Sequence, residues 1–278
     1  MKNLDKKVYA IWSPKAGVGK SFLAAHLAKL SSQDGYLTGV IDFNRQSPSL
    51  PSILDIHPPN EKSLKEALLT DKDSDVIINF HNNDKKDKNI FCLALNYNNK
   101  VDELNELEDD KVLRLLELAR PKFNILFLDL PTSYYELTSY ESWKYADKII
   151  VVIDNDYNSI VALKGYLKQF SEINIPLSKL VLIINKNLGI LDFNEVKEIS
   201  GLHVTAKIPF YKHVIKDLNE GKTVFENGGS YKDKKIIKGV NEVYNAITNE
   251  KIKQEQSTNA KKGFSLFKKK DKVAEETQ

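Results

Sequence analysis

Short apolar stretches bounded by turn-forming residues recur along most of the chain. These stretches are rich in β-branched residues, and several are apolar throughout, which is typical of strands that are covered on both faces of a sheet. The pattern predicts strands at Val8–Trp12, Leu37–Phe43, Val76–Phe80, Ile90–Leu95, Ile125–Leu130, Ile149–Ile153, Leu180–Ile184 and Val204–Ile208.

Between many of these strands, apolar residues repeat every three to four positions, which is the period of an amphipathic helix. The repeats predict helices around residues 23–30, 112–119, 160–170 and 236–247, and a short capped helix between Asp192 and Gly201. The polar residues 82–88 predict a surface loop. Because strands and helices alternate, we expect an α/β fold with a mostly parallel, doubly wound sheet and helices on both faces.

The apolar pattern stops near residue 250, where we place a boundary. Residues 1–250 are expected to form one domain, and residues 251–278 a basic, flexible C-terminal tail. The tail holds eight lysines and four acidic residues and so carries +4, which leaves −1 for the rest, since the whole chain carries +3. A near-neutral body argues against a nucleic-acid footprint that covers the surface.

Composition excludes several classes of protein. The single cysteine, Cys92, rules out an internal disulfide, a four-cysteine zinc site and a cysteine-held iron–sulfur cluster within one chain. Cys92 lies in an apolar stretch and is expected to be a small core residue. No apolar run approaches the roughly 18 residues of a membrane span, and no signal peptide is visible, so we expect a cytoplasmic protein.

The loop from Ser13 to Ser21 carries the clearest chemistry. It follows the first predicted strand, contains Gly17 and Gly19, and ends in Lys20 and Ser21 before a helical pattern. This order is that of a P-loop, in which glycines let backbone N–H groups approach phosphate oxygens. Lys20 would reach the β- and γ-phosphates, and the Ser21 hydroxyl would ligate Mg²⁺.

Lys15 adds a family resemblance. The common P-loop has glycine at the position of Pro14, whereas Lys15 resembles the lysine of the deviant Walker A loop of the ParA/MinD family. Ala16 departs from a glycine of that loop. Later segments match the family in order: Ile41–Gln46 (switch I), Phe127–Pro131 (switch II), and the adenine-side loops Ile184–Lys186, Ile208–Phe210 and Asn219–Gly221. The resemblance spans about residues 7–247 and points to the MinD-like or the pilus-localising TadZ/CpaE-like branch.

The resemblance implies a role for each matching residue. Lys15 would donate charge across a dimer interface to the partner's nucleotide. The catalytic group would be Lys15, Lys20, Asn44 and Asp129, and Mg²⁺ would be held by Ser21, Asp42 and Asp129. ATP would be bound by Lys15, Ala16, Gly17, Val18, Gly19, Lys20, Ser21, Phe22, Asn185 and Pro209.

One residue bears on the hydrolysis reaction and another on the choice of nucleobase. Many family members carry a second switch I aspartate where this chain has Asn44, and asparagine orients water but is no useful base at neutral pH. We therefore expect slow ATP hydrolysis. Guanine recognition usually needs an aspartate three residues after Asn185, where this chain has Leu188, so adenine is favoured.

The tail interleaves the apolar residues Phe264, Leu266 and Phe267 with lysines. Such a segment can bind an anionic bilayer surface, and it resembles the C-terminal membrane-targeting segment of the MinD branch. The alternative is a solvated tail. A membrane-binding tail would place the protein peripherally at the inner face of the plasma membrane.

Together these features predict an ATPase of the ParA/MinD type that forms a homodimer with ATP. It would position machinery such as a division site, a pilus or a flagellum, together with an unidentified protein partner or activator. Two alternatives are an ATP-binding scaffold with little hydrolysis and a DNA-partition ATPase. The near-neutral body makes nucleic acid the less favoured partner.

Overall fold

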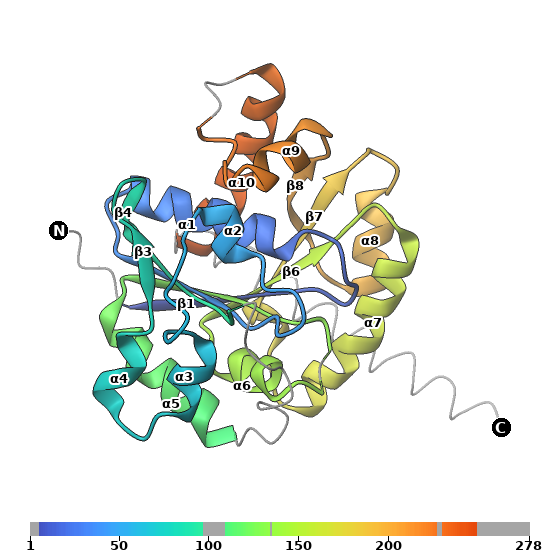
Figure 1. Cartoon of the computed structure of the whole chain (residues 1–278). Coiled ribbons are helices and arrows are strands. Elements are labelled where there is room, and N and C mark those ends of the chain that lie inside the picture. Colours follow the sequence, from blue (N-terminus) through green and yellow to red (C-terminus); the bar gives the residue numbers. More distant parts are fainter. Residues whose placement is uncertain (1–5, 97–108, 134, 227–229, 249–278) are drawn as a thin grey trace.

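A computed structural model describes residues 6–96, 109–133, 135–226 and 230–248 of the 278-residue chain. The strands form an eight-stranded sheet in the order β3-β4-β2-β5-β1-β6-β7-β8 (Figure 1). Only the edge pair β3–β4 is antiparallel among the described strand pairs. The strands are β1 (Lys7–Trp12), β2 (Thr38–Asp42), β3 (His81–Asn83), β4 (Asp87–Leu93), β5 (Ile125–Asp129), β6 (Lys148–Ile153), β7 (Leu180–Asn187) and β8 (Val204–Pro209).

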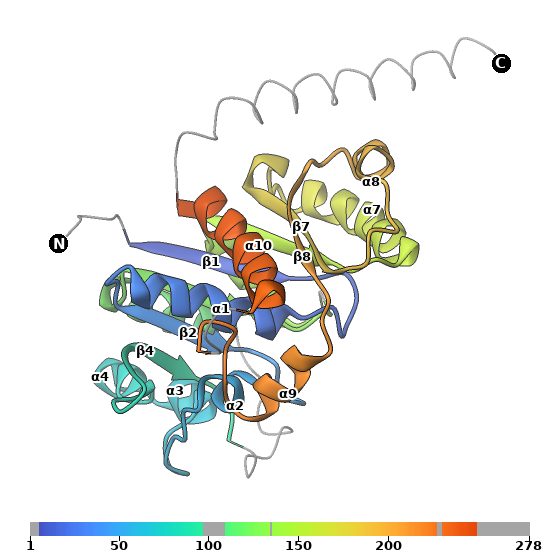
Figure 2. The same ribbon diagram turned by 90° about the horizontal axis from the view of Figure 1, so that it is seen from above.

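Helices cover both faces of the sheet, which confirms the predicted fold class (Figures 1 and 2). One face packs against α1 (Lys20–Gln33), α2 (Leu50–Leu54), α9 (His213–Asn219) and α10 (Tyr231–Thr248). The other packs against α3 (Leu64–Leu69), α4 (Asp73–Ile77), α5 (Asp109–Ala119), α6 (Leu137–Tyr145), α7 (Tyr157–Glu172) and α8 (Phe193–Ser200). Single-turn 3₁₀ helices η2 (Arg120–Lys122) and η3 (Leu177–Lys179) precede β5 and β7.

Side chains alternate between two apolar cores, one on each face of the sheet. In β1, Val8, Ala10 and Trp12 point into one core, whereas Tyr9 and Ile11 point into the other. Both sets are fully or almost fully buried. Burial on both faces explains the uninterrupted apolar runs within the central strands.

The parallel register brings two carboxylates together at the carboxyl end of the sheet. Asp42 ends β2 and Asp129 ends β5, and the two residues are paired in the β2–β5 ladder. Ile11, near the end of β1, is the register partner of Asp129 on the other side. Because ligands of open α/β sheets bind beyond the carboxyl ends of the strands, this edge positions the site.

The short helix predicted between Asp192 and Gly201 is confirmed as α8. The Asp192 side chain accepts from the Asn194 backbone N–H at 2.9 Å, and Gly201 ends the helix in the left-handed region with φ 69°. Both cap types satisfy backbone groups that the helix itself leaves unpaired.

The predicted strand Val76–Phe80 is wrong, because residues 73–77 form α4. Val76 and Phe80 are buried while Ile78 is 55% exposed, which is a helical spacing in a run that looks uniformly apolar. The surface loop predicted at residues 82–88 is only partly right. Residues 84–86 form a turn, but they join His81–Asn83 and Asp87–Leu93, which pair as an antiparallel hairpin. Because β3 lies at the edge of the sheet, its residues can be polar and give no apolar signal.

Candidate functional site

The loop between β1 and α1 turns on two glycines in the left-handed region, Gly17 with φ 75° and Gly19 with φ 96°. Gly19 is the N-cap of α1, and this N-terminus has neither a side-chain cap nor an acidic residue in its first turn. Its first backbone N–H groups therefore have no partner within the helix and no side-chain acceptor at the cap. A helix end of this kind, together with the loop, favours a phosphate group.

Strand β7 supports the loop from the side. The Asn185 side-chain NH₂ donates to the Val18 carbonyl oxygen at 2.8 Å, and the Lys186 ammonium donates to the Gly17 carbonyl oxygen at 2.5 Å. A Cβ atom on Gly19 would lie 2.3 Å from the Asn185 side-chain nitrogen. Glycine is therefore required at position 19 by both the backbone conformation and this close contact.

Lys20 begins α1 and extends toward the switch II loop. Its ammonium donates to the hydroxyl oxygens of Ser13 and Thr132, each at 3.1 Å. Burial lowers the pKa of Lys20, while the charges of Asp129 and Asp42 oppose that shift. The ammonium is thus paired with two neutral oxygens, although two buried carboxyl groups lie near it. Thr132 was not among the predicted residues.

Asp129 is buried with one oxygen engaged and one unengaged. Its Oδ2 accepts from the Ser21 hydroxyl at 2.5 Å, and its buried Oδ1 has no hydrogen-bond partner among the residues that the structure describes. Burial, and then the charge of Asp42, raise the pKa of Asp129 to about 8. An unpaired carboxylate oxygen beside a serine hydroxyl fits Mg²⁺, which takes one or two protein oxygens together with phosphate and water oxygens. Within the described ranges, no three His, Cys, Asp or Glu side chains form a metal site by themselves.

Asp42 is occupied by backbone groups. Its Oδ1 accepts from the Asn44 N–H at 3.0 Å, and its Oδ2 accepts from the N–H groups of Ser49 and Leu50 at 2.8 and 3.0 Å. Burial raises the pKa of Asp42 to about 6, and these hydrogen bonds oppose the shift. Asp42 thus ties the switch I segment to the start of α2. The Asn44 side-chain oxygen accepts weakly from the Ser47 N–H at 3.4 Å.

A cavity of about 370 Å³ opens beside the loop. It brings together eight predicted residues, namely Gly17, Gly19, Lys20, Ser21, Phe22, Asn44, Asn185 and Pro209. Its apolar end consists of Phe210, Tyr211, Val214, Ile215, Leu218 and Ile236. Phe210 belongs to a predicted adenine-side loop, whereas the other five were not predicted to line the site. Val214 and Leu218 are four residues apart, which is a helical spacing that could have indicated α9. The cavity joins an apolar end to a phosphate-binding end, and its volume suits a small ligand.

Three of the ten residues predicted to bind the nucleotide, Lys15, Ala16 and Val18, do not line the cavity. Lys15 makes ion pairs with Asp154, at 3.5 Å, and with Asp156, both in the β6–α7 loop of the same chain. Ala16 is exposed, and the Val18 side chain is fully buried in the core, so Val18 contributes through its backbone. The tail residues Phe264, Leu266 and Phe267 lie outside the described residues. No helix within the described ranges is both long enough and apolar enough to span a bilayer.

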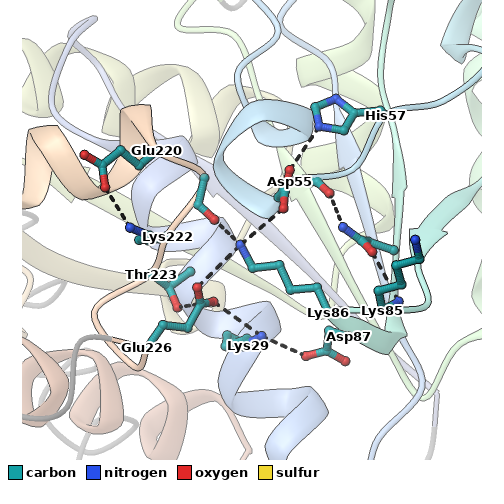
Figure 3. A network of polar contacts seen from close by, with 12 residues as sticks. Lys29, Asp55, His57, Lys85, Lys86, Asp87, Glu220, Lys222, Thr223 and Glu226 are labelled. Atoms are coloured by element: carbon teal, nitrogen blue, oxygen red, sulfur yellow. Dashed lines mark hydrogen bonds and ion pairs between the residues drawn. The ribbon is translucent and has the colours of Figure 1, made fainter.

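A second charged cluster includes Lys29, nine residues after Lys20 on α1, and we call it the hairpin cluster. Figure 3 shows its lysines and carboxylates converging from α1, the end of α2, the β3–β4 hairpin and the segment after α9. The ammonium of Lys86 donates to the Gly221 carbonyl oxygen and lies 3.4 Å from a Glu226 oxygen. The cluster consists of Lys29, Asp55, Lys86, Asp87 and Glu226.

A glycine-rich loop between strand and helix, a Lys-Ser pair and carboxylates at the ends of neighbouring strands define a P-loop nucleotide-binding protein. Residues 9–224 match the family model described as the CobQ/CobB/MinD/ParA nucleotide binding domain. The chain therefore belongs to this family, which confirms the resemblance to ParA/MinD proteins.

Relatives agree with this assignment. The chain is 26% identical over 279 residues to the septum site-determining protein MinD of Helicobacter pylori, covering 92% of this chain and 96% of that protein. The crystal structure of a ParA family ATPase from Chlorobium tepidum superposes with a TM-score of 0.73 at 18% identity, over 84% of this chain and 97% of that one. MinD from Pyrococcus horikoshii, complexed with Mg-ADP, gives 0.70 at 16% identity, over 90% and 99%. At these identities the structures support the fold alone.

Proposed function

We propose that this protein binds Mg-ATP, hydrolyses it slowly, and uses the nucleotide to form a homodimer that positions cellular machinery. One observation carries the proposal: among the described residues, the hydrogen-bond acceptors of Lys20 are neutral hydroxyl oxygens, and a buried oxygen of Asp129 has no partner. A Mg-triphosphate complements both, because its phosphate oxygens accept from the lysine and its metal accepts electron density from the carboxylate.

Each end of the site has its own residues for the ligand. The backbone N–H groups at Gly17 and Gly19 and the first turn of α1 would hold phosphates, and Ser21 with Asp129 would hold Mg²⁺. When bound, Mg²⁺ supplies positive charge that neutralises the phosphates. Phe22 and Pro209, with the apolar residues of α9, would hold the base, and Leu188 in place of an aspartate favours adenine.

Hydrolysis depends on what orients the attacking water. Asn44 lines the cavity, and an amide can orient water by hydrogen bonding without removing its proton. Slow turnover follows from that chemistry. A scaffold that binds ATP and hardly hydrolyses it is the second candidate, and the same asparagine favours it.

Dimerisation would use Lys15. Its side chain is 40% exposed and pairs with Asp154 and Asp156 at the surface, so it can leave them without exposing buried charge. We expect Lys15→Ala to bind ATP and to fail to dimerise or to turn over. Unchanged ATP-induced dimers of this variant, in size exclusion with light scattering, would remove the reason to assign Lys15 a role across the interface.

The cargo is proposed from the relatives. The Helicobacter pylori relative is named for septum-site determination and a structural neighbour is a ParA family ATPase. A division site, a pilus or a flagellum would be positioned together with a protein partner or activator, at the inner face of the membrane when the tail is bound.

Membrane binding by the tail can be tested by sedimentation with anionic liposomes, which should require ATP and should be abolished by Phe264→Glu or Phe267→Glu. ATP-independent sedimentation would assign the tail to solvent, and salt-sensitive DNA binding would favour the partition class.

The central test is nucleotide binding. Calorimetry should detect Mg²⁺-dependent binding of ATP to the wild type and none to Lys20→Ala. Lys85→Ala is the matched control, because that lysine is exposed on the turn between β3 and β4 and does not line the cavity. Equal affinity of the wild type and Lys20→Ala for ATP would overturn the proposed function.

A further inference from the structure

Thr132 contacts the P-loop lysine from the opposite side of the site. It lies three residues beyond Asp129, in the loop that leaves β5, and its hydroxyl oxygen accepts from the Lys20 ammonium at 3.1 Å. The other acceptor of that ammonium is Ser13 at the same distance. The two hydroxyls are similar in chemistry but differ in what they can still do.

The difference lies in the hydroxyl hydrogens. Ser13 donates its own to the Lys15 carbonyl oxygen at 2.6 Å, so that its donor and one of its acceptor sites are used. Within the described part of the chain, the Thr132 hydroxyl accepts from Lys20 and has no acceptor for its own hydrogen. An ammonium has three N–H groups, two of which are engaged here. Thr132 and Lys20 therefore present an O–H and an N–H donor side by side.

The backbone of Thr132 is held by the core, which fixes where this donor lies. The Trp12 indole N–H donates to the Thr132 carbonyl oxygen at 3.2 Å. Trp12 is fully buried and contacts Trp143 and Phe170 edge-on, with ring centroids 5.1 and 5.4 Å apart. Rigid placement of a donor reduces the entropy lost when it binds a ligand atom.

Thr132 is at the phosphate end of the site. It contacts the Lys20 ammonium, yet it does not line the cavity that reaches Pro209, Tyr211 and Val214. A nucleotide whose base occupies the apolar end would bring only its outermost phosphate to the lysine and threonine. Two adjacent donors fit an oxygen atom that carries negative charge.

We propose that the Thr132 hydroxyl donates to the terminal phosphate of a nucleoside triphosphate and so distinguishes ATP from ADP. The proposal rests on the function proposed above and adds a positioning and specificity residue to it. In the free protein Thr132 holds Lys20 in place. With the triphosphate bound, Lys20 and Thr132 both donate to it, and the switch II loop is thereby connected to the phosphate.

The test compares two substitutions that differ by one hydroxyl. Thr132→Val keeps the shape of the side chain and removes the donor, whereas Thr132→Ser keeps the donor. Calorimetry with Mg-ADP and with the Mg complex of a non-hydrolysable ATP analogue gives the preference for the triphosphate. We expect Thr132→Val to lose affinity for the analogue about tenfold or more, because the lost bond is to a charged group, and to keep its affinity for ADP. Thr132→Ser should retain both.

Equal losses for both nucleotides would mean that Thr132 acts only by holding Lys20, and no loss would mean that it does not touch the phosphate. Either result overturns the proposal and leaves nucleotide binding intact. A wild type that binds neither nucleotide would instead overturn the proposed function, so the two failures are distinguishable.

Trp12 provides a second readout that does not depend on the calorimeter. In a Trp143→Phe background, the analogue should change the fluorescence of Trp12 more than ADP does, both with the native Thr132 and with Thr132→Ser. Thr132→Val, or Thr132→Ala should the valine variant fail to fold, should respond equally to the two nucleotides. A larger response to the analogue in the variant without the hydroxyl would contradict the assignment.

Discussion

Two groups of lysines and carboxylates flank α1, and they differ in how completely their charges are paired. In the hairpin cluster, Lys29 lies 3.2 Å from Asp87 and 3.5 Å from Glu226, and Lys86 contacts both Glu226 and Asp55. Each of these two cations therefore has two carboxylate partners (Figure 3).

The phosphate site is arranged differently. Lys20 donates to two hydroxyls, and the buried Oδ1 of Asp129 has no hydrogen-bond partner in the described part of the chain. Burial raises the pKa of both Asp42 and Asp129 above the usual range of a carboxyl group. Interactions that a structure leaves unmade are available to a ligand, so the paired cluster is expected to serve stability and the unpaired one function.

The largest expected effect comes from Asp129→Asn. The wild type should bind nucleotide more tightly with Mg²⁺ than without it. Removal of this carboxylate should reduce that gain in affinity by about a hundredfold, because the buried Oδ1 is the oxygen that is available to the metal. It should not reduce the free energy of unfolding at pH 7, since burial disfavours the charged form of Asp129. Calorimetry and denaturant titration measure the two quantities.

Asp87→Asn is the matched control in the hairpin cluster. This carboxylate is fully used, by Lys29 at 3.2 Å and by the Ser32 hydroxyl at 2.6 Å. The variant should lose stability and keep its Mg²⁺-dependent affinity. If instead Asp87→Asn lowered nucleotide affinity and Asp129→Asn lowered only stability, the division between the two clusters would be wrong.

His26 connects the two regions and should give the chain a pH-dependent stability. On α1, its Nδ1 lies 2.7 Å from the Phe22 carbonyl oxygen and its Nε2 accepts from the Val224 N–H at 3.2 Å. Complete burial lowers the pKa of His26 to about 4, below the value of 6.5 expected in the unfolded chain. Between these values the unfolded state binds the proton and the folded state does not, so the folded state loses stability as the pH falls from 6.5 toward 4.

The loss should amount to about 3 kcal/mol over this window and should be absent above pH 6.5. Denaturant titrations at several pH values measure it as the difference between the wild type and His26→Gln, which carries no titrating group. His57→Gln, at a side chain that is 80% exposed, is the control and should follow the wild type. A wild-type slope that persists in His26→Gln would assign the effect to other groups.

Lys86→Met should lower the free energy of unfolding by about 1–2 kcal/mol, since it leaves Asp55 and Glu226 without this cation. Nucleotide affinity of the folded protein should change little, because Lys86 does not line the cavity. Lys85→Met alters the exposed neighbour on the same turn and should be neutral. A loss of affinity without a loss of stability would place Lys86 in the functional group.

The smallest effect is expected at the surface pair of Lys15 with Asp154 and Asp156. The double variant Asp154→Asn and Asp156→Asn should modestly increase the fraction of ATP-induced dimer, because Lys15 no longer has to leave carboxylates of its own chain. Light scattering measures the fraction. Asp192→Asn, which alters a similar helix-capping aspartate on α8, should leave it unchanged.

Much of the fold follows from the order of residues along the chain. The apolar runs of β1, β5 and β6 are buried on both faces, and no polar position interrupts them. The errors fell where that signal is weak. The run of residues 76–80 includes the end of a short helix, and its Val76 and Phe80 side chains are buried in the core. A run of five residues is too short to reveal a helical period. The polar strand β3 pairs only at an edge of the sheet.

The sequence by itself determined the phosphate loop, because its glycines, Lys20 and Ser21 are contiguous and follow a strand. It also placed Asp42 and Asp129 one residue before the ends of predicted strands. Only the tertiary structure decided that Thr132 lies beside Lys20, 112 residues away in the chain, that Lys86 meets Gly221 and that α9 completes the cavity. Local backbone preferences and periodicity are encoded in neighbouring residues, whereas these contacts depend on the order in which strands join the sheet, which no short segment specifies.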